Sequence, residues 1–169
     1  MTTPRQITRL SLLIFSTLAI ICGSWVVSSE ESPQAPNWVV GLTDGRQLSL
    51  YHETGSGQKV VAIFWASWCS YCRELLPKLS SVYAAADHQK VKFVAMNIWE
   101  DGDPAAYLAN NSIDLPLTLH ADNIAVKYGV KGTPGVFVVG PNNKILYQRQ
   151  PGESSEQVVA SVINALSTK

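Results

Sequence analysis

The chain has no excess of charge of either sign, because Lys plus Arg and Asp plus Glu each total 13 among its 169 residues. Proteins that bind nucleic acid carry a basic patch or stripe, so this balance argues against a nucleic-acid partner. The sequence also lacks a glycine-rich phosphate loop, a serine nucleophile elbow, internal repeats and low-complexity tracts. It therefore offers no motif for phosphate binding or serine hydrolysis.

Side chains that bind metals are scarce. The three histidines, His52, His88 and His120, are scattered, and none stands at metal-ligand spacing from a cysteine. Of the three cysteines, one lies in an apolar N-terminal run, which leaves Cys69 and Cys72. Two cysteines supply two soft ligands, whereas a structural zinc site needs four. The sequence therefore predicts no metal site and no cofactor.

The N-terminus carries a long apolar run. Leu10 to Val27 contains no charge, includes Cys22 as a small apolar residue, and follows Arg5 and Arg9. Its length reaches the lower limit for a membrane span, and the preceding arginines favour a cytoplasmic N-terminus. We expect residues 1–29 to be a cytoplasmic n-region and an uncleaved, single-pass signal anchor, with a cleaved signal peptide as the alternative. Either way, the rest of the chain would lie outside the cytoplasm.

The remaining chain reads as a linker and one domain. Residues 30–37 contain two prolines and form the expected linker, and residues 38–169 form a domain of ordinary size. We expect a polar loop at 52–59. The expected strands are 38–42, 47–50, 60–65, 91–97, 115–119, 136–139 and 144–149. The expected helices are 70–87, 103–110, 122–128 and 154–166. This order predicts an α/β fold with a mixed central sheet flanked by helices.

Two cysteines separated by two residues, Cys69 and Cys72, follow the apolar strand at 60–65. They lie at the start of the expected helix, so one helical turn brings both sulfurs together. The helix N-terminus favours the thiolate of Cys69, and a thiolate is the species that attacks a disulfide. We therefore expect Cys69 to be the nucleophile and Cys72 to resolve the mixed disulfide. A purely structural disulfide here would close too small a loop to stabilise the fold much.

Three segments carry a resemblance to a known family. Phe64 to Cys72 resembles the active-site segment of the thioredoxin superfamily, Gly132 to Pro134 resembles its cis-proline loop, and Pro77 matches the proline of its active-site helix. The hairpin signal Asp44-Gly45 and the extra segment 101–119, together with the N-terminal anchor, narrow the match. In these features the chain is similar to the TlpA/ResA/DsbE (CcmG) branch of membrane-tethered, extracytoplasmic thiol–disulfide oxidoreductases.

The resemblance implies a thioredoxin-like fold with an N-terminal β-hairpin and a central insertion, preceded by one transmembrane helix. It also implies a redox-active disulfide between Cys69 and Cys72 and a cis bond before Pro134. In this family the backbone at that proline pairs with an incoming polypeptide as an extra strand. The expected substrate groove is lined by Trp68, Tyr71, Thr133 and Pro134.

The chain departs from the family pattern at two positions. Ile63 stands where thioredoxin itself has a buried aspartate. Leu75 stands where ResA-like proteins have a glutamate, and Glu74 lies one residue earlier on a different helix face. The sequence therefore does not identify the proton acceptor for Cys72. Glu74 and Glu100 are weak candidates, because each is more commonly a solvated surface acid.

The sequence predicts an extracytoplasmic thiol–disulfide oxidoreductase of the bacterial inner membrane, anchored through residues 10–27. The resemblance implies reduction of specific partner disulfides, such as those of apocytochrome c before haem attachment. Because a periplasm is kept oxidising, a membrane electron donor would have to re-reduce the enzyme. Two alternatives remain. One is a copper-binding chaperone with Cys69 and Cys72 as soft ligands, and the other is a general disulfide oxidase or isomerase.

Overall fold

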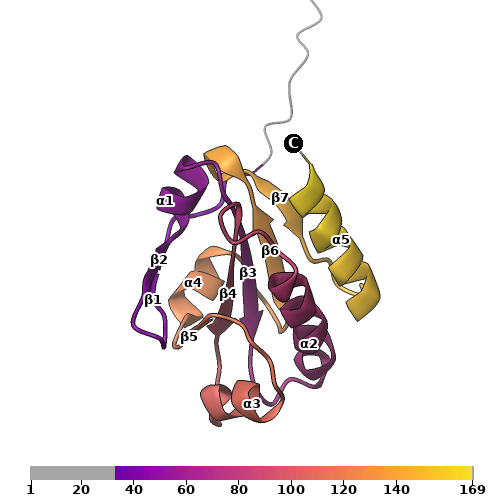
Figure 1. Ribbon diagram of the computed structural model, residues 1–169. Coiled ribbons are helices and arrows are strands. Elements are labelled where there is room, and N and C mark those ends of the chain that lie inside the picture. The colour runs from indigo at the N-terminus through magenta and orange to yellow at the C-terminus, as the bar shows by residue number, and fades with distance from the viewer. Residues whose placement is uncertain (1–32, 169) are drawn as a thin grey trace, which may run out of the picture. The chain divides into compact units, whose positions relative to one another are not determined.

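The computed structural model describes residues 33–168, which fold around a five-stranded sheet (Figure 1). The strands are β3 (Lys59–Trp65), β4 (Val91–Asn97), β5 (Leu117–Thr118), β6 (Gly135–Val139) and β7 (Ile145–Gln148). Their order across the sheet is β5-β4-β3-β6-β7. β3, β4 and β5 run parallel, whereas β6 is antiparallel to β3 and β7 is antiparallel to β6. The mixed sheet confirms the fold class expected from the order of elements.

Helices and a hairpin cover the two faces of this sheet. The helices are α1 (Leu50–Gly55), α2 (Ser70–Ala84), α3 (Pro104–Asn110), α4 (Asp122–Lys127) and α5 (Ser155–Ser167), with a 3₁₀ turn, η1, at Pro141–Asn143. The hairpin consists of β1 (Val39–Gly41) and β2 (Gln47–Ser49). α2 and α5 lie on one face, and α4 and the hairpin contribute to the apolar core on the other (Figure 1).

The central strand β3 is apolar throughout because both of its faces are covered. From Val60 to Trp65 every side chain is fully buried. Alternate residues point to opposite faces, so Ile63 and Trp65 join the core beneath α2 and α5, whereas Ala62 and Phe64 join the other core. This packing explains why the strand shows a continuous apolar run rather than a polar–apolar alternation.

Several local signals in the sequence are confirmed. Asp103 caps α3 by accepting a hydrogen bond from the Ala106 N–H at 2.9 Å. Ser154 and Gln157 form the expected capping box at the start of α5, with hydrogen bonds of 2.8 and 3.2 Å. Helix α2 continues through Pro77. The two capping contacts fix where α3 and α5 begin.

The expected loop at 52–59 was wrong in its first half, because residues 52–55 belong to helix α1. Leu50 and Thr54, one turn apart, are buried, and the Thr54 hydroxyl hydrogen-bonds the Asn143 side chain at 2.6 Å. A helix of six residues depends on such tertiary contacts more than on its own propensity. Sequence periodicity therefore did not reveal it.

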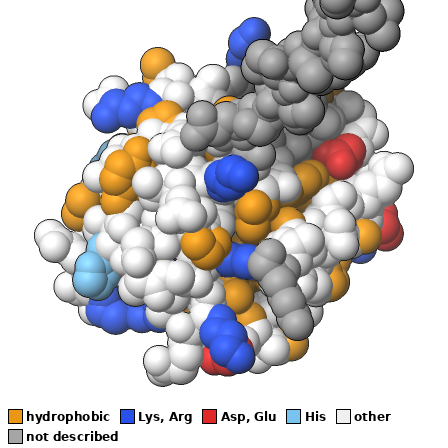
Figure 2. Space-filling model, turned by 90° about the horizontal axis from the view of Figure 1, so that it is seen from above, with side chains coloured by type: hydrophobic (Ala, Val, Ile, Leu, Met, Phe, Trp, Pro, Cys, Tyr) orange, Lys and Arg blue, Asp and Glu red, His pale blue; other side chains and the backbone are white. Residues whose placement is uncertain are grey.

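The expected membrane anchor at 10–27 lies outside the described residues. Within 33–168, no helix is both long enough and apolar enough to cross a membrane. The described part of the expected linker contacts the domain, since the Ala35 N–H donates to the Asn143 carbonyl at 2.8 Å. Seen from above, the domain shows hydrophobic, basic and some acidic side chains spread among its other surface atoms (Figure 2).

Candidate active site

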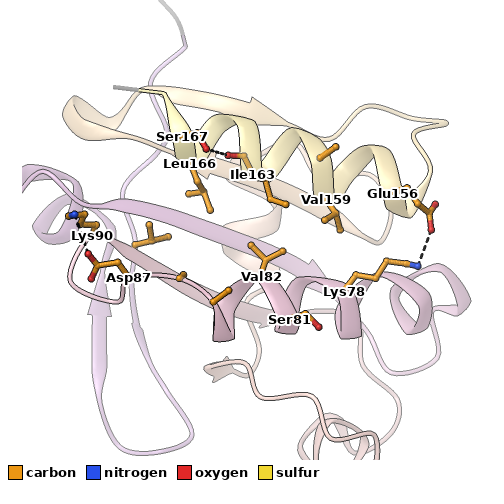
Figure 3. A pocket seen from close by; sticks show the side chains of 14 residues that line it. Lys78, Ser81, Val82, Asp87, Lys90, Glu156, Val159, Ile163, Leu166 and Ser167 are labelled. Carbon is orange, nitrogen blue, oxygen red and sulfur yellow. Dashed lines mark hydrogen bonds and ion pairs between the residues drawn. The ribbon is translucent and has the colours of Figure 1, made fainter.

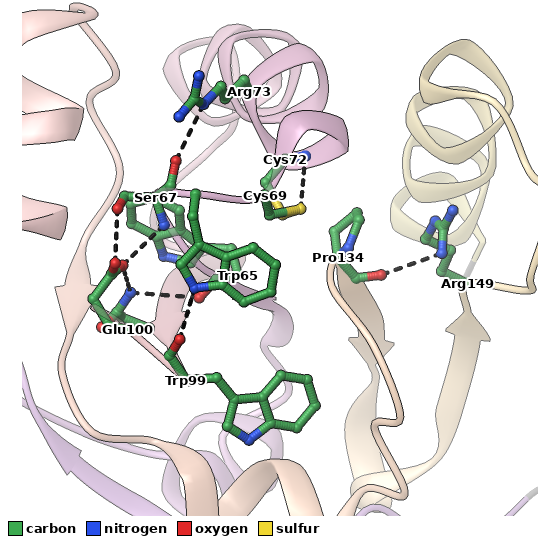
Figure 4. Close-up of a disulfide and its surroundings, with 11 residues drawn as sticks. Trp65, Ser67, Cys69, Cys72, Arg73, Trp99, Glu100, Pro134 and Arg149 are labelled. Atoms are coloured by element: carbon green, nitrogen blue, oxygen red, sulfur yellow. Dashed lines mark hydrogen bonds between the residues drawn. A yellow bond between two sulfur atoms is a disulfide. The ribbon is translucent and has the colours of Figure 1, made fainter. Parts of the chain in front are cut away.

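Cys69 and Cys72 form a disulfide at the start of α2, with their Cα atoms 5.2 Å apart (Figure 4). Cys69 is the N-cap residue of the helix, and its sulfur accepts a hydrogen bond from the Cys72 N–H at 3.1 Å. Both side chains are buried, with 5% of Cys69 and 1% of Cys72 exposed. The carboxyl end of β3 and the first turn of α2 therefore hold the sulfur pair just beneath the surface.

Pro134 lies beside this disulfide (Figure 4). The Thr133–Pro134 peptide bond is cis, as the resemblance implied. The antiparallel pairing of Phe64 with Gly135 brings the start of β6 to the edge of the sheet where β3 ends. Thr133 and Pro134 also line a hollow of about 380 Å³ between residues 129–135 and 148–151. The structure thus brings the predicted proline loop to the edge of the sheet that carries the dithiol, with Pro134 beside the disulfide.

Tyr71 lies between the two cysteines in the sequence, and Arg149 packs against its ring. The guanidinium carbon of Arg149 lies 4.9 Å from the centre of the Tyr71 ring, and the Tyr71 hydroxyl donates to the Glu153 carbonyl. Arg149 also donates to the carbonyl oxygens of Pro134 at 3.3 Å and of Glu153 at 3.4 Å. The Tyr71 side chain is partly buried and is held against the loop before α5.

Glu100 accepts hydrogen bonds from several groups, including those of the loop that precedes α2 (Figure 4). Ser67 donates to it through its N–H at 2.9 Å and its hydroxyl at 2.7 Å, Asn97 donates at 2.6 Å, and the Gly102 N–H donates at 3.0 Å. Burial acts to raise the pKa of Glu100, but the hydrogen bonds from these groups outweigh it and lower the pKa. Glu100 is therefore an ionised residue whose hydrogen bonds hold the active-site loop, and it is not a solvated surface acid.

This arrangement does not supply a proton acceptor for Cys72. The lowered pKa of Glu100 makes it a weak base, and its oxygens are already engaged. The other candidate, Glu74, is exposed on α2. Ile63 and Leu75, which replace the family's acidic residues, are fully buried apolar side chains.

Three tryptophans surround the disulfide segment in different environments. Trp65 is fully buried in the core, whereas Trp68 is 46% exposed. The Trp68 Nε1 group donates to the Trp99 carbonyl oxygen at 2.7 Å, and Trp99 is itself 41% exposed. Trp99 was not predicted from the sequence. Trp99 follows the carboxyl end of β4, which is the parallel neighbour of β3. Residues at the carboxyl ends of parallel strands often form sites, and this rule could have pointed to Trp99 in the sequence.

A larger hollow of about 930 Å³ lies between α2 and α5 (Figure 3). Its walls are mainly apolar, with Val82 and Ile163 among them, and the ion pair between Lys78 and Glu156 spans one end at 2.9 Å. No cysteine lines it, and its α2 wall begins at Lys78, beyond the first turn of the helix. This hollow is therefore separate from the dithiol site. Within residues 33–168 there is also no group of three or more metal-ligating side chains.

A mixed five-stranded sheet, with a Cys-x-x-Cys disulfide at the start of a helix and a proline loop beside it, defines the thioredoxin class of protein. Residues 47–167 match the model of the thioredoxin-like domain, so the chain belongs to that family. The match covers the site from β3 through α2 to the proline loop.

Individual relatives agree with this assignment. The chain is 26% identical over 150 residues to thiol-disulfide oxidoreductase ResA of Bacillus subtilis, covering 88% of this chain and 81% of that relative. It is 25% identical over 124 residues to sporulation thiol-disulfide oxidoreductase A of the same organism, covering 70% and 73%. A crystal structure described as thiol:disulfide interchange protein DsbE of Chlorobium tepidum matches with a TM-score of 0.67 and 27% identity, covering 81% of this chain and 98% of that one. The chain is accordingly a thiol–disulfide oxidoreductase of the ResA/DsbE type.

Proposed function

We propose that the enzyme reduces disulfides of specific partner proteins through a mixed disulfide between Cys69 and the partner, which Cys72 then resolves. The observation that carries the assignment of roles is the position of Cys69 at the N-cap of α2, where the Cys72 N–H reaches its sulfur at 3.1 Å. In the reduced protein, this N–H and the positive end of the helix dipole would favour a thiolate on Cys69. Cys72 has less exposed surface and suits the second, internal step.

The two steps balance in atoms and electrons. The Cys69 thiolate attacks one sulfur of the partner's disulfide, so that bond breaks and the other partner sulfur leaves as a thiolate. Cys72 then loses its proton and attacks the Cys69 sulfur, which releases the second partner thiolate. The partner has gained two electrons and, after protonation, two protons. The enzyme is left with the Cys69–Cys72 disulfide, the state seen in the structure.

Substrate contacts in this proposal come from the proline loop. Pro134 lies beside the disulfide (Figure 4), and an extended polypeptide would pair there with the backbone of the loop as an extra strand. On the other side of this loop, Thr133 and Pro134 contribute to the lining of the 380 Å³ hollow. Trp68 forms the exposed rim on the other side of Cys69. Tyr71 contributes to holding the loop rather than to contact with the substrate, because its hydroxyl is engaged by Glu153.

Substitution of each cysteine tests this assignment. Cys69→Ser should abolish disulfide reduction, whereas Cys72→Ser should accumulate covalent mixed disulfides with partners, visible on non-reducing gels. Cys22→Ser is the matched control and should behave like the wild type. Modification of Cys72 before Cys69 by iodoacetamide at neutral pH would contradict the assigned roles. A measured reduction potential as oxidising as that of dedicated disulfide oxidases would favour the oxidase alternative instead.

The cellular setting is also part of the proposal. We infer an inner-membrane protein anchored through residues 10–27, with its domain on the periplasmic side and a membrane donor that re-reduces it. The apolar run after two arginines supports this topology. The role in cytochrome c maturation is part of the proposal because the resemblance of the sequence motifs to the TlpA/ResA/DsbE (CcmG) branch implies it. Mass spectrometry of the membrane fraction should find the peptide that follows Arg9 on the mature protein. A mature start near Ser28, with release by osmotic shock, would refute the anchor.

A further inference from the structure

We propose that Trp68 and Trp99 form an aromatic platform that binds an aromatic or aliphatic side chain adjacent to the reactive cysteine of the substrate polypeptide. This inference rests on the proposed function and adds to it a residue, Trp99, that selects among substrates.

The conformation of Trp99 is held in place by the residues around it. Its backbone has a φ of 51°, a left-handed conformation that bulky residues rarely adopt. Two hydrogen bonds hold it there, from its N–H to Asp122 at 3.0 Å and from the Trp68 ring to its carbonyl at 2.7 Å. Such strain persists only where surrounding structure maintains it, and it concentrates at functional sites.

The platform presents apolar surface to solvent. The indole N–H of Trp68 is used inside the protein, so the exposed 46% of that side chain offers mainly ring carbon. Trp99, whose backbone carbonyl accepts the hydrogen bond from the Trp68 ring, is itself 41% exposed. The neighbouring acids Glu100 and Asp122 accept hydrogen bonds from the protein's own groups. An apolar side chain of the substrate therefore fits this surface better than a charged one, and tryptophan is common at sites that dominate binding energy.

The position of the platform explains why the occupant is the substrate itself. Trp68 directly precedes Cys69, and Trp99 follows β4, which flanks β3 on the side opposite β6 and Pro134. Figure 4 shows Trp99 and Pro134 on different sides of the region in front of the disulfide. A polypeptide lying across Cys69 would pair its backbone beside Pro134 and place a flanking side chain on the two rings.

The test compares two disulfide peptides that are identical except for Leu or Ser beside the reactive cysteine. With the reduced full chain, Trp99→Gly should raise the KM for the Leu peptide about tenfold and leave the KM for the Ser peptide and both kcat values unchanged. Glycine removes the ring yet suits the left-handed backbone, so this variant should fold. Trp99→Phe should retain most of the selectivity. Ile163→Ala, which removes an exposed apolar side chain on α5, should match the wild type.

The outcomes separate this inference from the proposed function. Equal KM values for the two peptides in the wild type, or a loss in Trp99→Gly that is the same for both, would overturn the platform. If the wild type reduced neither peptide, the proposed reduction would fail. Calorimetric binding of the same peptides with serine in place of cysteine would still decide whether Trp99 confers the preference for Leu. Unchanged iodoacetamide reactivity of Cys69 in Trp99→Gly shows that the dithiol itself is intact.

Discussion

Arg149 lies over the ring of Tyr71, with its guanidinium carbon 4.9 Å from the ring centre. This contact joins the residue between the two cysteines to the segment that follows β7. The same guanidinium donates to the Pro134 carbonyl oxygen at 3.3 Å. One side chain therefore connects the disulfide turn with the proline loop, although these segments are far apart in the sequence. The geometry of the site depends on this connection as well as on the cysteines.

Removal of the Arg149 head group should loosen both loops. Arg149→Met should lower the free energy of unfolding by about 1–3 kcal/mol, because Pro134 and Glu153 each lose a charged donor. Tyr71→Phe should cost about 1 kcal/mol through the lost hydroxyl bond. Because both side chains contact each other and Glu153, a double-mutant cycle in urea unfolding should show a non-zero coupling.

Arg46→Met supplies the matched control for this prediction. Arg46 forms an exposed ion pair with Asp44 in the hairpin, so its removal should change stability by no more than about 1 kcal/mol. Additive effects of Arg149→Met and Tyr71→Phe would show that the contact between them contributes nothing, and would contradict the connection described above.

Lys59 should stabilise the end of α5. Its ammonium donates to the carbonyl oxygens of Ala165 at 3.1 Å, Leu166 at 2.9 Å and Thr168 at 2.5 Å, where the helix leaves carbonyls without partners. Lys59→Met should therefore lower the free energy of unfolding by about 1–2 kcal/mol and speed hydrogen exchange in the last turn of α5.

Lys92→Met is the control for Lys59. Lys92 donates to a single carbonyl, that of His88, at an exposed position, so its loss should change stability by less than about 0.5 kcal/mol. An equal effect of the two substitutions, or unchanged exchange in α5, would show that the lysine does not cap the helix.

The sequence predicted those parts of the fold that depend on local pattern. The apolar run of β3, the turn at Asp44-Gly45 and the caps at Asp103 and Ser154 each result from neighbouring residues, and each is present in the structure. Helix α1 was missed because six residues give too little periodicity, and its burial depends on distant contacts.

In the candidate site, too, residues in local motifs could be predicted, whereas residues that distant contacts bring to the site could not. Cys69, Cys72 and Pro134 lie in short motifs that a single sequence can reveal. Arg149 and Trp99 lie in no motif, and they contribute only because the sheet order brings the ends of β4 and β7 to the site. The sequence alone favours a solvated surface acid at Glu100. Its hydrogen bonds become evident only when the loop of Ser67 is placed beside it.

The negative charge of Glu100 should stabilise the fold. Its carboxylate accepts bonds from Ser67, Asn97 and Gly102, and these lower its pKa in the folded protein despite the opposing effect of burial. Because the folded pKa lies below that of the unfolded chain, about 4.3, the carboxylate contributes stability that is fully present above that pH. This contribution should be lost as the pH falls through the folded pKa.

Glu100→Gln should therefore lower the free energy of unfolding at pH 7 by about 1–3 kcal/mol, since one oxygen is replaced by an amide group that cannot accept from Ser67 or Asn97. The deficit relative to the wild type should shrink as the pH falls through the lowered pKa of the folded wild-type carboxylate, because that carboxylate then also becomes neutral. Glu74→Gln, at an exposed position on α2, is the matched control and should follow the wild-type curve. Urea unfolding at pH 3 to 8 provides the measurement. A deficit of constant size across that range would show that the Glu100 charge contributes nothing, and that only the shape of the side chain holds the Ser67 loop in place.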